Sequence, residues 1–309
     1  MGSKISAAPI CSVIVAYHED PATLKKLLNA LEGRVEHTIV VVNGRKPGDV
    51  SLASNDVHSR SCTWVYNPDN IGLAAAQNQG IRLARERGAN AIVFFDQDSF
   101  PPPETVAQLA LAWNRLQADG RAPAAVGVSY YQGGSRQVWP GFVRIRWWGF
   151  GRKRCAHAED IVEADFLISS GSLIPMAVLD DVGPMDGALF VDHVDTEWCL
   201  RAASKGYRLF GVCSVKMRHA LGERSQRVWF GRWRQVSSHQ PLRYYYMFRN
   251  SMLLYKRRYI PFAWKSGDIL RSLQMLVFFG LFSSQRRQVL IMMMRGWRDG
   301  LRNRGGEFG

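Results

Sequence analysis

Two aspartates, spaced one residue apart, have the residue type and position needed for chemistry at a phosphate group. Asp96 directly follows the largely apolar run "NAIVFF" at residues 90–95, and Asp98 comes two residues later. In an extended chain, side chains at i and i+2 share a face and lie about 6.5–7 Å apart. Such carboxylates suit Mg²⁺ or Mn²⁺ held jointly with a phosphate. They would equally suit a turn in which an aspartate caps the following helix.

A second acidic cluster lies about one hundred residues downstream, in "FVDHVDTEWCLR" at residues 190–201. It contains Asp192, Asp195 and Glu197. An acidic residue at a helix start either interacts with the helix dipole or acts as a general base facing a hydroxyl. His219 follows an apolar strand and is either structural or a further metal ligand.

Small and polar residues form two further motifs. In "NPDNIGLAAAQNQG" at 67–80, Gly72 would let a ligand approach the backbone near a helix N-terminus. Asn70 in the same motif is either part of that site or a helix cap. The segment "SSGSL" at 169–173 would either shape a sugar-sized pocket or form an ordinary turn. The chain contains neither a P-loop nor G-x-G-x-x-G, which argues against ATP hydrolysis and NAD chemistry.

The elements that must position these residues alternate between strands and helices. The predicted strands are continuous apolar runs, which is typical of a mostly parallel sheet covered on both faces. Ligands bind beyond the carboxyl ends of such strands, where Tyr17, Asn43, Asn67 and Asp96 lie. We predict strands at 11–17, 37–44, 63–67, 90–96, 124–131 and 207–213, and helices from Asp20–Pro21 to Gly33 and at 73–88, 104–120 and 195–206. Residues 132–160 read as irregular strands or a loop, and 241–304 as helical.

The composition is that of a globular protein, with 47% hydrophobic and 21% charged residues. The N-terminus lacks the apolar core of a signal peptide. The most apolar stretch is 14 uncharged residues between Arg271 and Arg286, whereas a membrane span needs about 20. The five cysteines are scattered and form no C-x-x-C pair. We therefore expect reduced thiols in a cytoplasmic protein and no zinc–thiolate site.

Most of the net charge of +14 is in the C-terminal segment, where residues 243–309 carry thirteen basic and three acidic side chains. Apolar residues recur there at helical spacing, with Arg271, Arg286 and Arg287 beside them. This pattern predicts a helix on an anionic membrane surface, or one packed on the protein or on a second subunit. Nucleic acid is disfavoured because residues 1–135 are neutral and the acidic clusters repel phosphate. The apolar residues are Ile269, Leu273, Leu276, Val277, Gly280 and Leu281.

Seven motifs, taken in order along the chain, resemble those of the inverting family-2 glycosyltransferases of the GT-A fold. They are "VIVAYHED", "NPDNIGLAAAQNQG", "FFDQDS", "ISSGSLIP", "FVDHVDTEWCLR", "MRHALGE" and "YYYMFRN". The resemblance is strongest to their bacterial dTDP-rhamnosyltransferase branch and covers about residues 8–304. It implies an α/β, Rossmann-like GT-A fold with a basic helical extension. We divide the chain into a flexible start (1–8), a catalytic domain (9–240, with a nucleotide-sugar half at 9–131 and an acceptor half at 132–240), a helical extension (241–304) and a tail (305–309).

The resemblance also implies residue roles. Asp195 corresponds to the catalytic base of an inverting, metal-assisted single displacement. Asp98 and Asp96 correspond to the D-x-D pair that holds Mg²⁺ or Mn²⁺, with Asp96 nearer the ribose, and His219 to a histidine that completes the metal site. The expected donor-binding residues are Tyr17, Asn43, Asn70, Gly72, Asn78, Asp96 and Gln97, and the expected acceptor-binding residues are Ser170, Gly171, Glu197 and Trp198.

The implied donor is dTDP-L-rhamnose, and the implied acceptor is a lipid-linked cell-envelope glycan such as O-antigen or lipopolysaccharide core. The strand that ends "VVVNG" lacks the Asp that precedes Asn43 in many relatives and recognises the pyrimidine. A UDP-hexose or UDP-galactofuranose donor therefore stays open, as does a homo-oligomer. We expect a cytoplasmic enzyme, peripheral on the inner face of the bacterial membrane. The non-enzyme alternative is a basic membrane- or nucleic-acid-binding protein.

Overall fold

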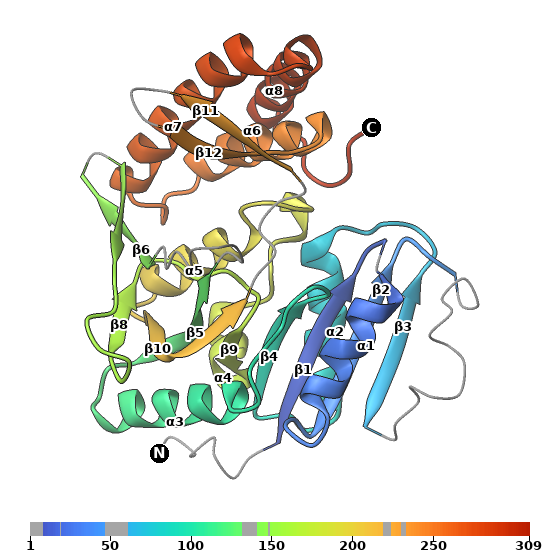
Figure 1. Cartoon of the computed structure of the whole chain (residues 1–309), viewed down its shortest axis with the longest axis vertical. Helices are drawn as coiled ribbons and strands as arrows, with labels where there is room; N and C mark the ends of the chain where they lie inside the picture. Colours follow the sequence, from blue (N-terminus) through green and yellow to red (C-terminus); the bar gives the residue numbers. More distant parts are fainter. Residues whose placement is uncertain are drawn as a thin grey trace.

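The structure is a computed structural model that describes residues 9–18, 20–46, 61–131, 141–147, 149–218, 224–229 and 233–309, with the backbone alone at 224–229 and 233–238. Figure 1 shows a large sheet flanked by helices, with the C-terminal helices gathered at one end of the molecule. His219 and residues 47–60 and 132–140 lie outside the described residues.

The large sheet has eight strands in the order β3-β2-β1-β4-β9-β5-β10-β8. The β1–β2, β2–β3, β1–β4 and β5–β10 pairs are parallel, whereas β9 and β8 run antiparallel to their neighbours. The predicted mostly parallel α/β sheet is thereby confirmed. The strands are β1 (Ile10–Ala16), β2 (His37–Asn43), β3 (Cys62–Asn67), β4 (Ala91–Asp96), β5 (Pro123–Tyr131), β8 (Ile161–Ala164), β9 (Ser172–Pro175) and β10 (Arg208–Arg218).

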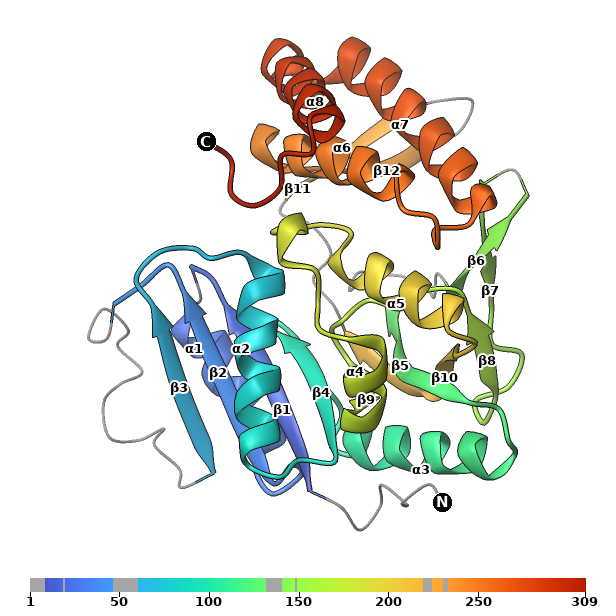
Figure 2. The same ribbon diagram turned by 180° about the vertical axis from the view of Figure 1, so that it is seen from behind.

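Helices cover both faces of this sheet, so the central strands are buried on both sides. One apolar cluster joins the sheet to α1 (Pro21–Leu31) and α3 (Thr105–Ala118). The other joins it to α2 (Leu73–Glu86), α4 (Met176–Val182) and α5 (Val194–Ser204), the helices nearer the viewer in Figure 2. The start of α1 follows the prediction: Asp20 accepts the N–H of Thr23 (3.1 Å), and Pro21 begins the helix.

The described part of 132–160 forms a small hairpin that sequence periodicity did not resolve. Its strands, β6 (Phe142–Arg146) and β7 (Gly149–Lys153), pair antiparallel. Two further differences from the predicted elements lie near β10, which extends to Arg218 instead of ending at Cys213. A second hairpin, β11 (Arg224–Trp229) with β12 (Trp233–Ser238), then precedes the C-terminal helices.

The predicted helical character of 241–304 is confirmed. The segment forms α6 (Pro241–Tyr255), α7 (Phe262–Phe282) and α8 (Arg286–Leu301). Helix α8 packs closely on α6 because Gly296 has no side chain: a Cβ there would lie 2.3 Å from the carbonyl oxygen of Tyr245. No helix among the described residues is both long and apolar enough to cross a membrane.

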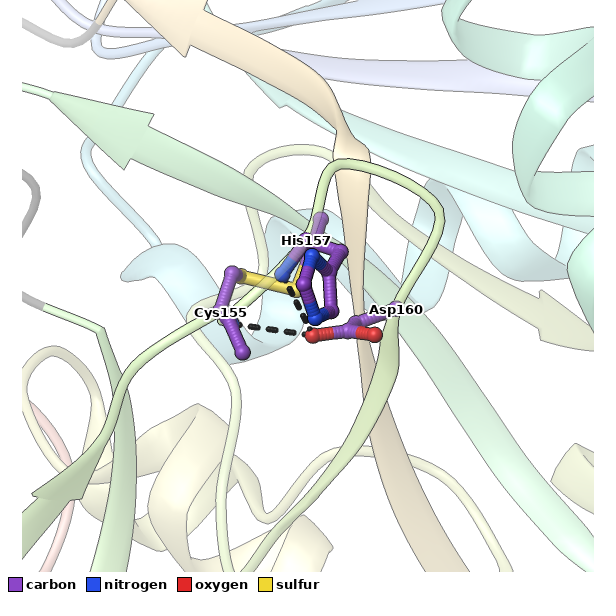
Figure 3. Close-up of a disulfide and its surroundings, with 5 residues drawn as sticks. Cys155, His157 and Asp160 are labelled. Carbon is purple, nitrogen blue, oxygen red and sulfur yellow. Dashed lines mark hydrogen bonds between the residues drawn. A yellow bond between two sulfur atoms is a disulfide. The ribbon is translucent and has the colours of Figure 1, made fainter.

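The expectation that all cysteines are reduced is wrong for one pair in this structure. Cys155 and Cys213, 58 residues apart in sequence, form a disulfide (Figure 3). The turn before β8 brings them together. The Asp160 carboxylate closes this turn by accepting the N–H groups of Ala156 and His157 (2.9 and 2.8 Å). The Asp160 carbonyl accepts the N–H of Cys213 (3.0 Å) and so links the turn to β10. Cys11, Cys62 and Cys199 are free thiols.

Candidate active site

Asp96 and Asp98 lie where β4 ends, at the edge of the sheet predicted for ligand binding. Both are partly exposed. A tight turn fixes their backbone, because the N–H of Ser99 donates to the carbonyl of Asp96 (3.0 Å). Ser170 holds the turn from the other side. Its hydroxyl accepts the N–H of Asp96 (3.2 Å) and is hydrogen-bonded to the Ser99 hydroxyl (2.6 Å). The two aspartates are thus presented by a turn that is fixed from two segments.

Tyr17 and Gln97 connect the ends of β1 and β4. The Gln97 amide accepts the N–H of Tyr17 (2.7 Å) and donates to its carbonyl (3.0 Å), so it extends the ladder between the two strands. The Tyr17 ring is 46% exposed and packs beside Gly44, where a Cβ would lie 3.3 Å from it. Tyr17 therefore offers an exposed aromatic face at the sheet edge, while Gln97 aligns the strands.

Asn43 and Asn70 hold the turn that begins α2. The Asn43 amide donates to Asn70 Oδ1 (2.7 Å), and Asn43 Oδ1 accepts the N–H of Ile71 (3.0 Å). Asn70 Oδ1 also accepts the N–H of Gly72 (3.0 Å). Asn43 is only 2% exposed, so it is placed to shape this turn rather than to contact a nucleobase.

Gly72 is required by close packing. Its φ is +85°, and a Cβ would lie 2.6 Å from the Phe190 ring and 2.9 Å from the Phe190 carbonyl oxygen. Asn78 joins the same two segments, because it donates to the Met185 carbonyl and accepts the Met185 N–H (both 2.9 Å). Asn78, predicted to bind the donor, thus fastens α2 to the loop before α5.

Asp195 lies in the first turn of α5, where it lines a cavity of about 370 Å³. Its carboxylate accepts the N–H of Thr196 (2.7 Å). Burial raises the pKa of Asp195 above the ordinary aspartate value. The N–H groups of Thr196 and Ser169 and the charge of His193 act against this rise in pKa, and the Asp96 carboxylate adds to it. Ser170, which holds the D-x-D turn, lines the same cavity as Asp195, so the two acidic motifs, about one hundred residues apart, lie near one another.

The cavity has apolar and polar walls of the kind that suit a sugar. Aromatic rings from the hairpin, from the segment after β8 and from α7 line it, together with charged groups of both signs. Ser170, one of the predicted acceptor residues, belongs to the wall. Gly171 does not line the cavity; its φ is +73°, and a Cβ would lie 2.5 Å from Val128. Other lining residues are Phe150, Phe166, Trp264, Asp192, Asp268 and Arg271.

The predicted contacts of Glu197 and Trp198 with an acceptor do not fit the structure. Glu197 is fully buried, and its carboxylate binds Arg201 (2.9 Å) and Arg257 (3.1 Å). Trp198 is 1% exposed and donates its indole N–H to the Gly183 carbonyl (2.9 Å). Both follow Asp195 on α5 but face the protein interior, since consecutive helix residues point to different sides.

The carboxylates at the end of β4 provide a donor set that fits a divalent metal. Hard oxygen ligands supplied by one or two carboxylates, completed by phosphate and water, are the usual surroundings of Mg²⁺. Asp98 and Asp96 meet that requirement at an exposed sheet edge. The part of the chain that the structure describes contains no group of three or more histidine, cysteine, aspartate or glutamate side chains placed to hold an ion. The third predicted ligand, His219, lies outside that part.

Sequence reasoning missed the polar residues that support the site from a distance. Ser99 was not singled out, although its hydroxyl contacts Ser170. Asp268 and Arg271 of α7 reach the cavity wall, and Arg249 and Asn250 of α6 contact the loop before Asp195. The only signal for the last two was the motif "YYYMFRN", whose adjacent Arg and Asn are unusual within a helix of aromatic residues.

Comparison with known proteins agrees with this geometry. Residues 11–183, more than half of the chain, match the profile described as Glycosyl transferase family 2. The chain is 29% identical over 265 residues to the dTDP-rhamnosyl transferase RfbF of Shigella flexneri, covering 85% of this chain and 86% of that protein.

Solved structures show the same fold at low sequence identity. TarS 1–349 of S. aureus in complex with UDP-GlcNAc has a TM-score of 0.56 and 12% identity, with 96% of this chain and 81% of that chain covered. GalNAc-T7 with UDP, GalNAc and Mn²⁺ has a TM-score of 0.55 and 13% identity; 69% of this chain is covered but only 43% of that one. These similarities establish the GT-A fold.

Proposed function

The chain belongs to glycosyl transferase family 2 and is a glycosyltransferase, and from this premise we propose that it moves L-rhamnose from dTDP-L-rhamnose to a hydroxyl of a lipid-linked cell-envelope glycan. The observation that carries the proposal is the position of Asp195, on the wall of a sugar-sized cavity that is also lined by Ser170, the residue that binds the Asp96 backbone. The similarity to a dTDP-rhamnosyl transferase over most of both chains supports the choice of sugar.

In this proposal Asp195 is the general base of a single displacement. It accepts the proton of the acceptor hydroxyl as that oxygen attacks the anomeric carbon from the face opposite the diphosphate. The N–H of Thr196 fixes one carboxylate oxygen (2.7 Å), which orients the group without neutralising it. The raised pKa of Asp195 makes it a stronger base than an exposed aspartate.

The donor occupies the edge formed by β1, β2 and β4. The half-exposed Tyr17 ring offers a stacking face for the nucleobase. The backbone of the Asn70–Gly72 turn lies at the positive N-terminal end of α2, which favours the negatively charged diphosphate. Asp98 and Asp96 would hold a divalent metal at the diphosphate, and His219 is retained as a proposed further ligand. When bound, such a metal neutralises charge that develops on the leaving diphosphate.

The acceptor sugar enters the cavity in front of Asp195. Phe150 and Phe166 provide apolar faces for the C–H groups of a pyranose ring, and their rings lie edge to face (centroids 6.1 Å apart). Asp192 and Arg271 provide groups that can accept and donate hydrogen bonds to sugar hydroxyls. Charges of both signs favour a neutral sugar over an acidic one.

The decisive experiment is a donor panel on purified protein with isolated lipid-linked acceptor. We expect product from dTDP-L-rhamnose and at most traces from dTDP-glucose, UDP-glucose or UDP-galactofuranose, with the linkage read by NMR. A specific observation keeps the UDP-sugar alternative in the panel: Asn43 is buried and no aspartate precedes it, so this pair of positions does not favour thymine over uracil. Preferential transfer from a UDP-sugar would replace the rhamnosyl assignment.

We also propose that one face of α7 rests on the anionic inner leaflet of the membrane. The side chains of Leu273, Val277 and Leu281 recur at helical spacing and are 49%, 63% and 64% exposed. Arg286 and Arg287, the first two residues of α8, follow shortly after α7 and are exposed. Each basic residue near an anionic surface contributes about 1 kcal/mol, and the apolar face adds to the binding free energy by burial.

Vesicle sedimentation tests the membrane face. Leu273→Glu with Val277→Glu should reduce recovery on vesicles that contain phosphatidylglycerol roughly tenfold, whereas Leu111→Glu, at an exposed apolar position of α3 (55% exposed), should leave recovery unchanged. Equal recovery of both variants would refute this proposal. A halved molecular mass of the double variant in light scattering would instead assign the face to a second copy of the chain.

A further inference from the structure

We propose that helix α6 positions the catalytic base: Asn250, aligned by Arg249, holds the loop at residues 188–193 that places Asp195 at the cavity. This inference rests on the proposed role of Asp195. It gives a function to the motif "YYYMFRN", which the mechanism above leaves without one. Arg249 and Asn250 are both fully buried and neither lines the cavity, so each acts through the loop and not on the sugar.

The loop needs external support because its backbone is in an unfavourable conformation. Phe190, Asp192 and His193 have φ values of 61°, 60° and 62°. The left-handed region is disfavoured for residues with a Cβ, and such conformations persist only where surrounding contacts determine them. His193 is the N-cap of α5, so its conformation sets the direction in which the helix and Asp195 leave the loop.

Asn250 supplies much of this support through the loop carbonyls. Its amide nitrogen lies 2.9 Å from the carbonyl oxygen of Leu189, 2.7 Å from that of Val191 and 2.8 Å from that of Asp192. An amide has two N–H donors, so these three oxygens share them. The contacts surround the left-handed Phe190 and reach Asp192, which is itself left-handed.

Arg249 fixes the orientation of the Asn250 amide. Its Nε donates to Asn250 Oδ1 (3.0 Å), which directs the amide nitrogen toward the loop. The rest of the guanidinium donates to the carbonyls of Leu189 (2.9 Å) and Ala188 (3.2 Å). The guanidinium also lies over the rings of Tyr245 and Tyr246, at 5.5 and 4.9 Å from their centroids, so neighbouring residues of the motif hold Arg249 in place.

Two further side chains on the C-terminal helices contact the same loop. Arg243 of α6 pairs with the Asp192 carboxylate at 3.1–3.2 Å. Arg271 of α7 lies 3.2 Å from His193 Nε2 and also donates to Asp268 (2.6 Å). The loop is therefore held from the helical extension at its backbone and at its side chains.

The test is Asn250→Leu, which keeps the approximate side-chain shape but removes both N–H donors. We expect kcat to fall at least 30-fold, the Kd of dTDP-L-rhamnose measured by calorimetry to change less than threefold, and amide hydrogen exchange at 189–195 to accelerate. The matched control is Phe248→Leu in the same helix. Phe248 is buried against Trp297 of α8, so this variant should lower the Tm but leave kcat and loop exchange unchanged.

The outcomes separate this inference from the proposed function. If wild-type protein transfers no sugar from any donor, the proposed function fails, while loop exchange still tests whether Asn250 holds the loop. Accelerated exchange with an unchanged kcat would overturn the positioning role, and so would a loss of donor affinity equal to the loss of kcat. If Asn250→Leu does not fold, Arg243→Gln replaces it, since Arg243 is half-exposed, and a three- to tenfold fall in kcat at constant donor Kd is expected.

Discussion

The two halves of the site are stabilised in different ways. On the donor side, Asn43 and Asn70 bind backbone N–H groups in the turn that begins α2, and Gln97 binds the backbone at the end of the neighbouring strand β1. On the acceptor side, Asp195 follows a left-handed loop that is supported by helices more than fifty residues downstream. The donor edge is thus held mainly by neighbouring strand ends of the sheet and by the turn before α2, whereas the proposed base depends on helices outside the sheet. Changes at the donor edge should therefore appear in donor affinity, and changes around Asp195 in kcat.

The largest effect is expected for Asp195→Asn. The amide cannot accept the acceptor proton, so kcat should fall by roughly 10²- to 10⁴-fold, the usual contribution of a general base. Donor Kd should stay within twofold, because Asp195 lines the cavity proposed for the acceptor and Tyr17 does not. Single-turnover transfer and calorimetry measure the two quantities. Undiminished turnover in this variant would remove Asp195 from the base role.

Removal of divalent metal should cause the next largest loss of activity. Chelation with EDTA should abolish transfer, and Mg²⁺ or Mn²⁺ should restore it. Asp98→Asn should lower kcat/KM about 100-fold or more, since a metal contributes several kcal/mol of charge stabilisation and about 1.4 kcal/mol is tenfold. Excess metal should partly rescue this variant but not Asp195→Asn. Full activity after complete chelation would contradict a metal role.

A smaller effect is expected for Asn70→Ala at the donor edge. The substitution leaves the Asn43 amide and the N–H of Gly72 without their acceptor. Buried unsatisfied groups cost about 1–3 kcal/mol, so donor KM should rise roughly tenfold while kcat is nearly kept. Asn29→Ala, on the exposed face of α1, is the control in the same kinetic assay. A fall in kcat at unchanged KM would break the division between the two halves.

The smallest predicted effect concerns pH. Because burial raises the pKa of Asp195, this carboxylate becomes protonated and inactive at a pH where an ordinary aspartate, with a pKa of about 3.9, is still ionised. The acid limb of kcat/KM should therefore lie above pH 4. In Asp96→Asn the limb should move to lower pH, since the Asp96 charge contributes to the rise. An acid limb at or below pH 4 in the wild-type protein would contradict the burial of the base.

The sequence predicted the donor half well because its signals are local. Strand periodicity and the motifs at 67–80 and 94–99 lie within single elements, and the sheet brings their ends together. Two side chains predicted to bind the donor, Gln97 and Asn78, instead make contacts within the protein. The prediction was misleading at Glu197 and Trp198, because both residues follow Asp195 closely in sequence but face the core. The support from Arg249 and Asn250 depends on tertiary contacts that no local pattern encodes.

The disulfide gives the acceptor half a topology of its own. The bond between Cys155 and Cys213 closes residues 155–213 into a covalent ring, and Ser170 and Asp195 are both members of it. A single proteolytic cut anywhere in that ring would leave one covalent molecule, seen as one band without reductant and as two with it. In a compartment that keeps thiols reduced, the ring would open and the same cut would release the two pieces once unfolded.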